Sequence, residues 1–148
     1  MATTSAPSET HVAARLRLAV TRTARRLRQE AGSGLSPALT AALATVERAG
    51  PLTPSEVAAA ERIQRPTATR ILARLEEEGL VQRVGAPADR RSFLVSVSPA
   101  GTALLAESRT RKDAFLARKL ATLAPADLVA LERAATVLER VLAEDDDR

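Results

Sequence analysis

The amino-acid sequence predicts a mainly α-helical fold with one small β-hairpin. Apolar residues recur at helical spacing along most of the 148 residues. Serine–proline pairs and glycines mark where successive helices begin and end. Between residues 80 and 97, two short apolar or alternating runs flank a polar, basic loop, a pattern typical of two strands joined as a hairpin. The length fits one compact domain or one protomer of an oligomer.

The amino-terminal part of the chain predicts two helices. Residues 1–10 are small and polar and are expected to be disordered. The first helix is expected from residue 11 to about residue 30, where Gly32-Ser33-Gly34 stops it. Ser36-Pro37 opens the second helix, since serine can cap a helix and proline fits its first turn. Gly50-Pro51 ends this second helix.

A short helix, a turn and a longer basic helix are expected next. Thr53-Pro54-Ser55-Glu56 is a capping box, which predicts a third helix that ends near residue 61 or 62. The fourth helix is expected over residues 63–80, with Gly79 suited to its C′ position. Its expected inward-facing residues are Ala68, Ile71, Leu72 and Leu75.

The remaining elements are a hairpin and two further helices. Strands are expected at residues 80–84 and 92–97. Ser98-Pro99 opens a fifth helix that should reach about residue 123, and Pro125 begins a sixth. Residues 144–148, with the acidic run Glu144-Asp145-Asp146-Asp147, are expected to form a solvated tail.

The composition excludes several classes of protein. Cysteine is absent, which excludes a disulfide framework and a thiol redox sensor. His11 is the only histidine, so a transition-metal site would have to rely on carboxylates, and we expect no metal and no cofactor. No apolar run is long enough to span a membrane, and the first ten residues lack the pattern of a signal peptide. The expected location is the cytoplasm, without a membrane partner.

Positive charge is carried almost entirely by arginine. The net charge is +4, and Lys112 and Lys119 are the only lysines. Arginine suits bidentate contact with phosphate or guanine, although a composition rich in arginine and alanine can also reflect the base bias of a genome. Aromatic residues make up only 1% of the chain, so the core must be built from leucine, valine, isoleucine and alanine.

The segment from residue 51 to residue 97 carries the strongest functional signal. It predicts a helix, a turn, a basic helix and a charged hairpin, which is the layout of a winged helix-turn-helix. A helix can enter the major groove of DNA, and a basic hairpin can reach the neighbouring minor groove. The candidate recognition-helix residues are Arg65, Pro66, Thr67, Thr69, Arg70 and Arg74. The candidate wing residues are Arg83, Asp89, Arg90 and Arg91.

These side chains suit double-stranded DNA as a partner. Short hydroxyls and a proline at the helix start allow close approach to bases, and arginines can reach guanine edges or phosphates. A merely solvated arginine face is the alternative, but a second basic element beside the first is harder to explain by chance. Enzyme signals are nearly absent: no phosphate-cradling loop or Ser-His-Asp arrangement is found, and His11 fits a surface histidine. We therefore expect a protein that is not an enzyme.

The chain resembles the MarR family of bacterial transcription regulators from His11 to Leu142. The most specific part is the run TRILARLEEEGLV, from Thr69 to Val81, followed by Asp89-Arg90-Arg91-Ser92 and the strand Phe93-Leu94-Val95-Ser96-Val97. Two positions depart from the family pattern. Glu61-Arg62 stands where a small residue is usual, and Gln64, a poorer N-cap, replaces the usual serine.

The resemblance implies a homodimer that binds a pseudopalindromic operator, usually as a repressor. It implies one protomer over residues 11–143, with dimerisation helices at about 11–32 and 99–143 and a winged helix-turn-helix at about 36–97. It also implies that Arg91 probes the minor groove while Asp89 orients the wing. In many members a small molecule, often aromatic or anionic, binds between the dimer helices and the DNA-binding lobe and releases DNA. The residues of such a ligand site are left undefined by this sequence.

Two further functions remain as alternatives at this point. A winged-helix module can bind a protein partner without binding DNA, since one fold hosts several functions. Arginines at the wing favour DNA over that alternative, and a duplex affinity with steep salt dependence would separate the two. A DNA-processing enzyme would need a metal or acid–base constellation, and the sequence offers none.

Overall fold

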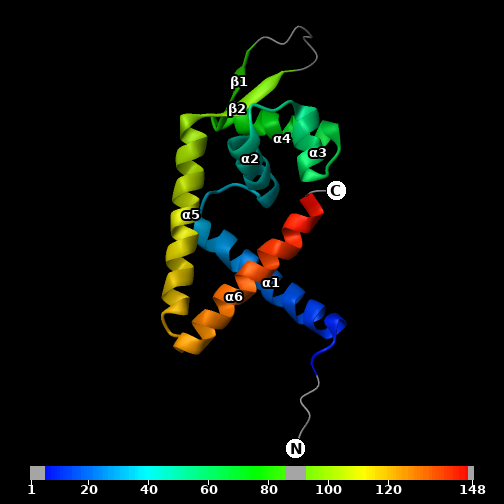
Figure 1. The fold of residues 1–148 in the computed structure, drawn as a ribbon. Coiled ribbons are helices and arrows are strands. Elements are labelled where there is room, and N and C mark those ends of the chain that lie inside the picture. Colours follow the sequence, from blue (N-terminus) through cyan, green and yellow to red (C-terminus); the bar gives the residue numbers. More distant parts are fainter. Residues whose placement is uncertain (1–5, 86–92, 147–148) are drawn as a thin grey trace, which may run out of the picture. The chain divides into compact units, whose positions relative to one another are not determined.

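The computed structural model describes residues 6–85 and 93–146 and confirms a mainly helical fold with one antiparallel hairpin (Figure 1). The elements are α1 (Glu9–Ala31), α2 (Pro37–Ala49), α3 (Pro54–Glu61), α4 (Arg65–Glu77), β1 (Val81–Val84), β2 (Leu94–Val97), α5 (Pro99–Leu120) and α6 (Pro125–Asp146). The chain divides into two compact units, Met1–Lys112 and Asp113–Arg148, and the division falls within the sequence of α5.

The core of the first unit is aliphatic, as the composition predicts. Helices α2, α3 and α4 each contribute one face to it, and the two strands and the start of α5 close it. The largest fully buried side chains are Leu43, Leu72, Leu75, Val46, Val57 and Val95. Burial of each aliphatic side chain contributes roughly 1.5–3 kcal/mol. This core holds the helix-turn-helix together.

The capping box at the start of α3 is confirmed. The backbone N–H of Thr53 donates to Oε2 of Glu56 at 2.7 Å, and the backbone N–H of Glu56 donates to Oγ1 of Thr53 at 3.2 Å. These bonds satisfy backbone donors that a helix start leaves unpaired. The hydrogen bond from the Thr53 backbone, followed by that from its hydroxyl, lowers the pKa of the Glu56 carboxyl.

Helix α4 begins later and ends earlier than the range 63–80 predicts. Arg62 adopts the left-handed conformation with φ of 53°, and Gln64 is extended with ψ of 142°, so the helix starts at Arg65. Gln64 makes no side-chain cap hydrogen bond, as expected for a poor N-cap. At the other end Gly79 is left-handed with φ of 72°, which lets the chain turn back and bury Leu80.

The hairpin pairs β1 with β2 in the register Val81↔Val97 to Val84↔Leu94. Leu52 bridges to the other edge of β2, where it exchanges backbone hydrogen bonds of 3.0 and 2.8 Å with Val95. This bridge ties the hairpin to the segment before α3. The strands start one and two residues later than expected, and the segment that joins them, 86–92, lies outside the described residues.

The terminal helices also differ from the predicted bounds. Helix α1 begins at Glu9, inside the segment expected to be disordered, because Oγ of Ser8 accepts from the backbone N–H of His11 at 3.3 Å and caps it. Helix α5 ends at Leu120 rather than near residue 123. Helix α6 runs to Asp146 and so includes acidic residues expected in a tail, since no glycine or proline interrupts it. None of the described helices is long and apolar enough to cross a membrane.

The start of α5 docks closely on the end of the helix-turn-helix. Oγ of Ser98 donates to the Gly79 carbonyl and accepts from the backbone N–H of Gly101 at 3.1 Å. Gly101 is buried, and a Cβ added there would lie 2.2 Å from the carbonyl oxygen of Leu80 and 2.9 Å from Cγ2 of Val97. Glycine at this position therefore sets how closely α5 approaches the hairpin.

Gly101→Ala should lower the free energy of unfolding by roughly 1–3 kcal/mol, the usual cost of overpacking a close contact. Helix propensity alone predicts the opposite sign, because alanine is favoured over glycine in a helix by roughly 1 kcal/mol. Urea unfolding followed by circular dichroism measures the change. The control is Thr102→Ala at the exposed neighbouring position, which should leave stability within about 0.5 kcal/mol. Stabilisation by Gly101→Ala would contradict the close approach.

Candidate nucleic-acid interface

Helix α4 has one buried face and one exposed face. Ala68, Leu72 and Leu75 are at most 1% exposed, and Ile71 is partly buried beside them. This confirms the predicted inward face. The opposite side is turned to solvent; its exposed residues are Arg65, Pro66, Thr69, Arg70, Ala73 and Arg74. The structure therefore brings the candidate recognition residues onto one accessible surface, with Thr67 half-buried at its edge.

The first turns of this surface present polar groups with little competition from other side chains. Oγ1 of Thr69 donates to the Arg65 carbonyl at 3.0 Å, which leaves its lone pairs to accept. Arg65 and Arg70 have no ion-pair partner within residues 6–85 and 93–146. A shallow cavity of about 330 Å³ lies beside Arg70, between Thr67 and Leu39 of α2. The arginines at this end can therefore turn toward a ligand.

Arg74 is held differently. Its guanidinium forms ion pairs with Glu77 at 3.4 Å and with Glu78 at 2.7 Å. All three side chains are well exposed, so these pairs are worth little and can exchange with another anion. Two adjacent carboxylates nevertheless offset the charge that Arg74 adds to the surface.

Arg83 is also engaged. Its Nε donates to Oε1 and Oε2 of Glu76 at 3.2 and 3.3 Å, and its guanidinium carbon lies 3.9 Å from the centroid of the Phe93 ring. Arg83 stays about half exposed. The other candidate wing residues, Asp89, Arg90 and Arg91, lie outside the described residues, so their DNA-contact and wing-orienting roles stay predictions.

Glu76 and Phe93 also belong to this surface, and the sequence pattern did not predict them as parts of it. Acidic residues at a helix C-terminus oppose the helix dipole, so the dipole does not account for the run Glu76-Glu77-Glu78. This unfavourable placement of three glutamates was the one feature of the sequence that could have indicated a tertiary role for Glu76. The structure shows the reason for the run, since each of the three carboxylates pairs with an arginine.

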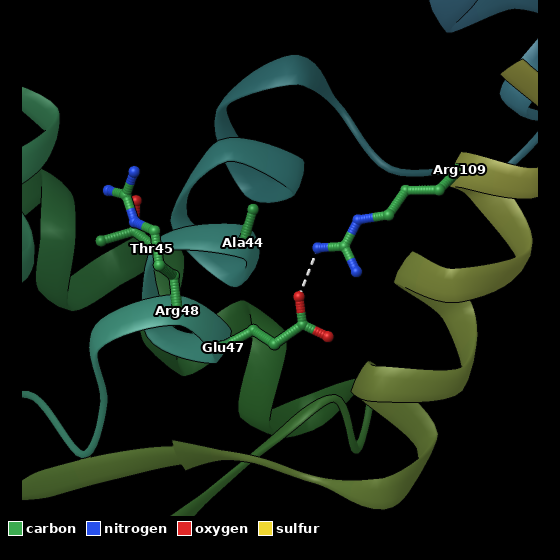
Figure 2. Close-up of a pocket in the computed structure, with 5 residues that line it drawn as sticks. All are labelled: Ala44, Thr45, Glu47, Arg48 and Arg109. Carbon is green, nitrogen blue, oxygen red and sulfur yellow. Dashed lines mark hydrogen bonds and ion pairs between the residues drawn. The ribbon is translucent and has the colours of Figure 1, made fainter. Parts of the chain in front are cut away.

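A second polar hollow lies between α2 and the first part of α5 (Figure 2). It has a volume of about 420 Å³ and is lined by Ala44, Thr45, Glu47, Arg48 and Arg109. Arg109 reaches from α5 to pair with Glu47, and this hydrogen bond and the accompanying charge attraction raise the pKa of Arg109. Nothing in the sequence pattern singled out this pair, because its members are 62 residues apart.

No group of three or more histidine, aspartate or glutamate side chains is placed to hold a metal ion in the described part of the chain. The chemistry that this surface does offer is hydrogen bonding and charge attraction from arginine and threonine side chains on a rigid helix.

Proteins of known class resemble this chain over most of its length. The model of the MarR family matches residues 35–93. An uncharacterized HTH-type transcriptional regulator of Mycobacterium bovis is 37% identical over 132 residues, which are 88% of this chain and 92% of the relative. A second uncharacterized HTH-type transcriptional regulator, from Mycobacterium leprae, is 38% identical over 117 residues, covering 78% of this chain and 82% of that protein.

Solved structures show the same fold. A putative transcriptional regulator of Pseudomonas aeruginosa superposes with a TM-score of 0.79 at 34% identity, covering 92% of this chain and 98% of that one. FabT of Streptococcus pneumoniae, whose structure contains DNA, superposes with a TM-score of 0.68 at 18% identity, covering 93% of this chain and 99% of its own. The helix-turn-helix, the hairpin and these relatives agree: the chain belongs to the MarR family of transcription regulators.

Proposed function

We propose that this transcription regulator binds double-stranded DNA sequence-specifically as a homodimeric repressor at a pseudopalindromic operator. Helix α4 enters the major groove, and the wing reaches the neighbouring minor groove. The observation that carries this proposal is the exposed face of α4, where Arg70 is exposed on a helix whose Ala68, Leu72 and Leu75 are buried. The fold shared with FabT, which was solved in complex with DNA, adds support.

The protein-interaction alternative has less support. Relatives at 37–38% identity are named transcriptional regulators, and a partner-binding module has no evident need for unpaired arginines on α4. The family consists of transcription regulators rather than enzymes, in agreement with the absence of catalytic motifs from the sequence. A regulator that binds the chromosome of a bacterium works in the cytoplasm, which is the location that we propose.

Dimerisation is proposed from the apolar faces of α1 and α6. Along α1 the exposed large apolar residues are Val12, Leu16, Leu18 and Val20; along α6 they are Leu128, Val129, Leu131, Val137, Val141 and Leu142. A large number of exposed apolar side chains on a helix favours an interaction site there. A two-fold partner would cover these faces and set two recognition helices about one DNA turn apart, as an operator with two half-sites requires.

An effector that releases DNA is proposed to bind the hollow between α2 and α5. Arg48 and Arg109 line it, and only Arg109 is paired with Glu47 (Figure 2). A small anion could take the place of the Glu47 carboxylate at Arg109 or bind Arg48. The charge of the lining therefore favours an acidic effector over a neutral or basic one.

Leu16→Glu should convert the dimer into a monomer, because it places a charge within the apolar stripe of α1. The matched control is Arg25→Glu, nine residues further on and so about half a turn round the same helix. Sedimentation velocity at micromolar concentration measures the assembly state. A wild-type protein that sediments as a stable monomer would contradict the proposed dimer.

Arg70→Ala should weaken operator binding by roughly 1–3 kcal/mol if Arg70 makes a bidentate base contact. Arg70→Lys keeps the charge but lacks the planar fork, so it should recover little of that loss. Fluorescence anisotropy with operator and scrambled duplexes measures both variants. The charge control is Arg118→Ala, an exposed position in the second unit. An equal loss on both duplexes would assign Arg70 to phosphate, and no loss on either would remove it from the interface.

Arg91→Ala should weaken operator binding while leaving fold and dimer intact. We expect its guanidinium to enter a narrow minor groove, where A·T-rich DNA concentrates negative potential. The loss should therefore be greatest on operators with A·T-rich flanks, and the dependence of affinity on salt should become less steep. Titrations of wild type and variant over a salt series test this. Identical affinities and slopes would show that the wing does not touch DNA.

A further inference from the structure

The guanidinium of Arg83 touches two elements besides its own strand. It lies on β1, it pairs with Glu76 of α4 through both carboxylate oxygens, and it stacks on the ring of Phe93, which directly precedes β2. One side chain thus joins the recognition helix to both strands of the wing. We define Glu76, Arg83 and Phe93 as the wing anchor.

The wing anchor lies where the two strands lead into the segment that connects them. Arg83 directly precedes Val84 of the last strand pair, Val84↔Leu94, and Phe93 directly precedes Leu94, the first residue of β2. The connecting segment, which carries Asp89, Arg90 and Arg91, starts immediately beyond that pair. The placement of the strand ends therefore decides where this connecting segment begins.

The charge and the geometry around Arg83 favour a positioning role over a direct contact with DNA. The Glu76 carboxylate offsets the Arg83 charge, so the pair attracts phosphate less than an unpaired arginine would, and unlike Arg74, Arg83 is also stacked on an aromatic ring. The Nε–H is already donated and one face of the guanidinium is covered by the Phe93 ring. Arg70 differs from Arg83 in its charge balance, since Arg70 has no ion-pair partner among the described residues.

We propose that Arg83 is a positioning residue that sets the placement of the wing relative to α4 through Glu76 and Phe93, and that it does not contact DNA. This inference rests on the proposed DNA-binding function. It also reassigns Arg83, which the sequence analysis placed among the residues that contact DNA.

The direction in which a Glu76 substitution changes the affinity for operator DNA tests the inference. Glu76→Ala removes a negative charge from a surface that faces DNA, so simple charge attraction predicts tighter binding. The anchor predicts the opposite: Glu76→Ala and Arg83→Ala should each weaken operator binding roughly tenfold, and the double variant should be no weaker than the worse single one. Alanine is the best helix former, so α4 itself should not suffer. Anisotropy titrations use the operator duplex recovered by selecting genomic fragments on the purified wild-type protein.

Matched variants complete the design. Glu77→Ala removes the same charge from the next residue, which pairs with Arg74 rather than with the wing, and should leave binding unchanged or tighter. Exchanging the two charges, Glu76→Arg with Arg83→Glu, should restore part of the lost affinity. If Arg83 bound phosphate, a glutamate there would instead weaken binding further.

Hydrogen exchange tests the anchor without DNA. The paired amides of β1 and β2 should exchange several-fold faster in Glu76→Ala and Arg83→Ala than in wild type or Glu77→Ala, because local opening becomes easier. Tighter binding by Glu76→Ala, or unchanged binding and exchange in both variants, would overturn the inference while leaving the proposed function standing. A wild-type protein that binds no duplex would instead overturn the proposed function, and the inference with it.

Discussion

Burial of one face of α4 is the interaction on which the rest of the structure depends. Leu72 and Leu75 belong to one buried cluster with Leu43 of α2 and Val57 of α3, and all four are at most 1% exposed. Rotating α4 by one residue would turn these side chains by about 100° and bring them into water. The cost of that exposure fixes which residues face outward, so Arg70 is presented to solvent by the packing on the other side of its helix.

The same core sets the position of the hairpin and of α5. The left-handed Gly79 reverses the chain after α4, Leu80 packs into the core, and β2 is held on both edges by β1 and Leu52. Gly101 then brings α5 against the Leu80 carbonyl. Helix α4, the two strands and the first part of α5 therefore contribute to one packed core. Such packing can hold in a constant relation the two elements that we propose to contact DNA, as groove recognition requires.

Electrostatic pairing divides the arginines of this surface into two groups. Arg74 and Arg83 are offset by three glutamates from the end of α4, whereas Arg65 and Arg70 have no ion-pair partner among the described residues. Exposed pairs contribute little to stability. These pairs instead change the electrostatic potential of the surface and hold side chains in place. Unpaired positive charge remains on Arg65 and Arg70, in the first half of α4, whereas the arginine side chains near the end of α4 are held by glutamates. A count of arginines overstates how many of them are free to bind an anion.

The sequence by itself determined the helical elements, the capping box at Thr53, the turn at Gly79 and the inward face of α4, because each follows from interactions between residues only a few positions apart. It misplaced the start of α4, where Arg62 takes a left-handed conformation that no local residue type demands. The family resemblance was also readable from a continuous run of residues. Only the tertiary structure decided that Glu76 and Phe93 hold Arg83 and that Glu47 meets Arg109. Such contacts depend on where separate elements pack, and the spacing of residues along the chain carries no record of that.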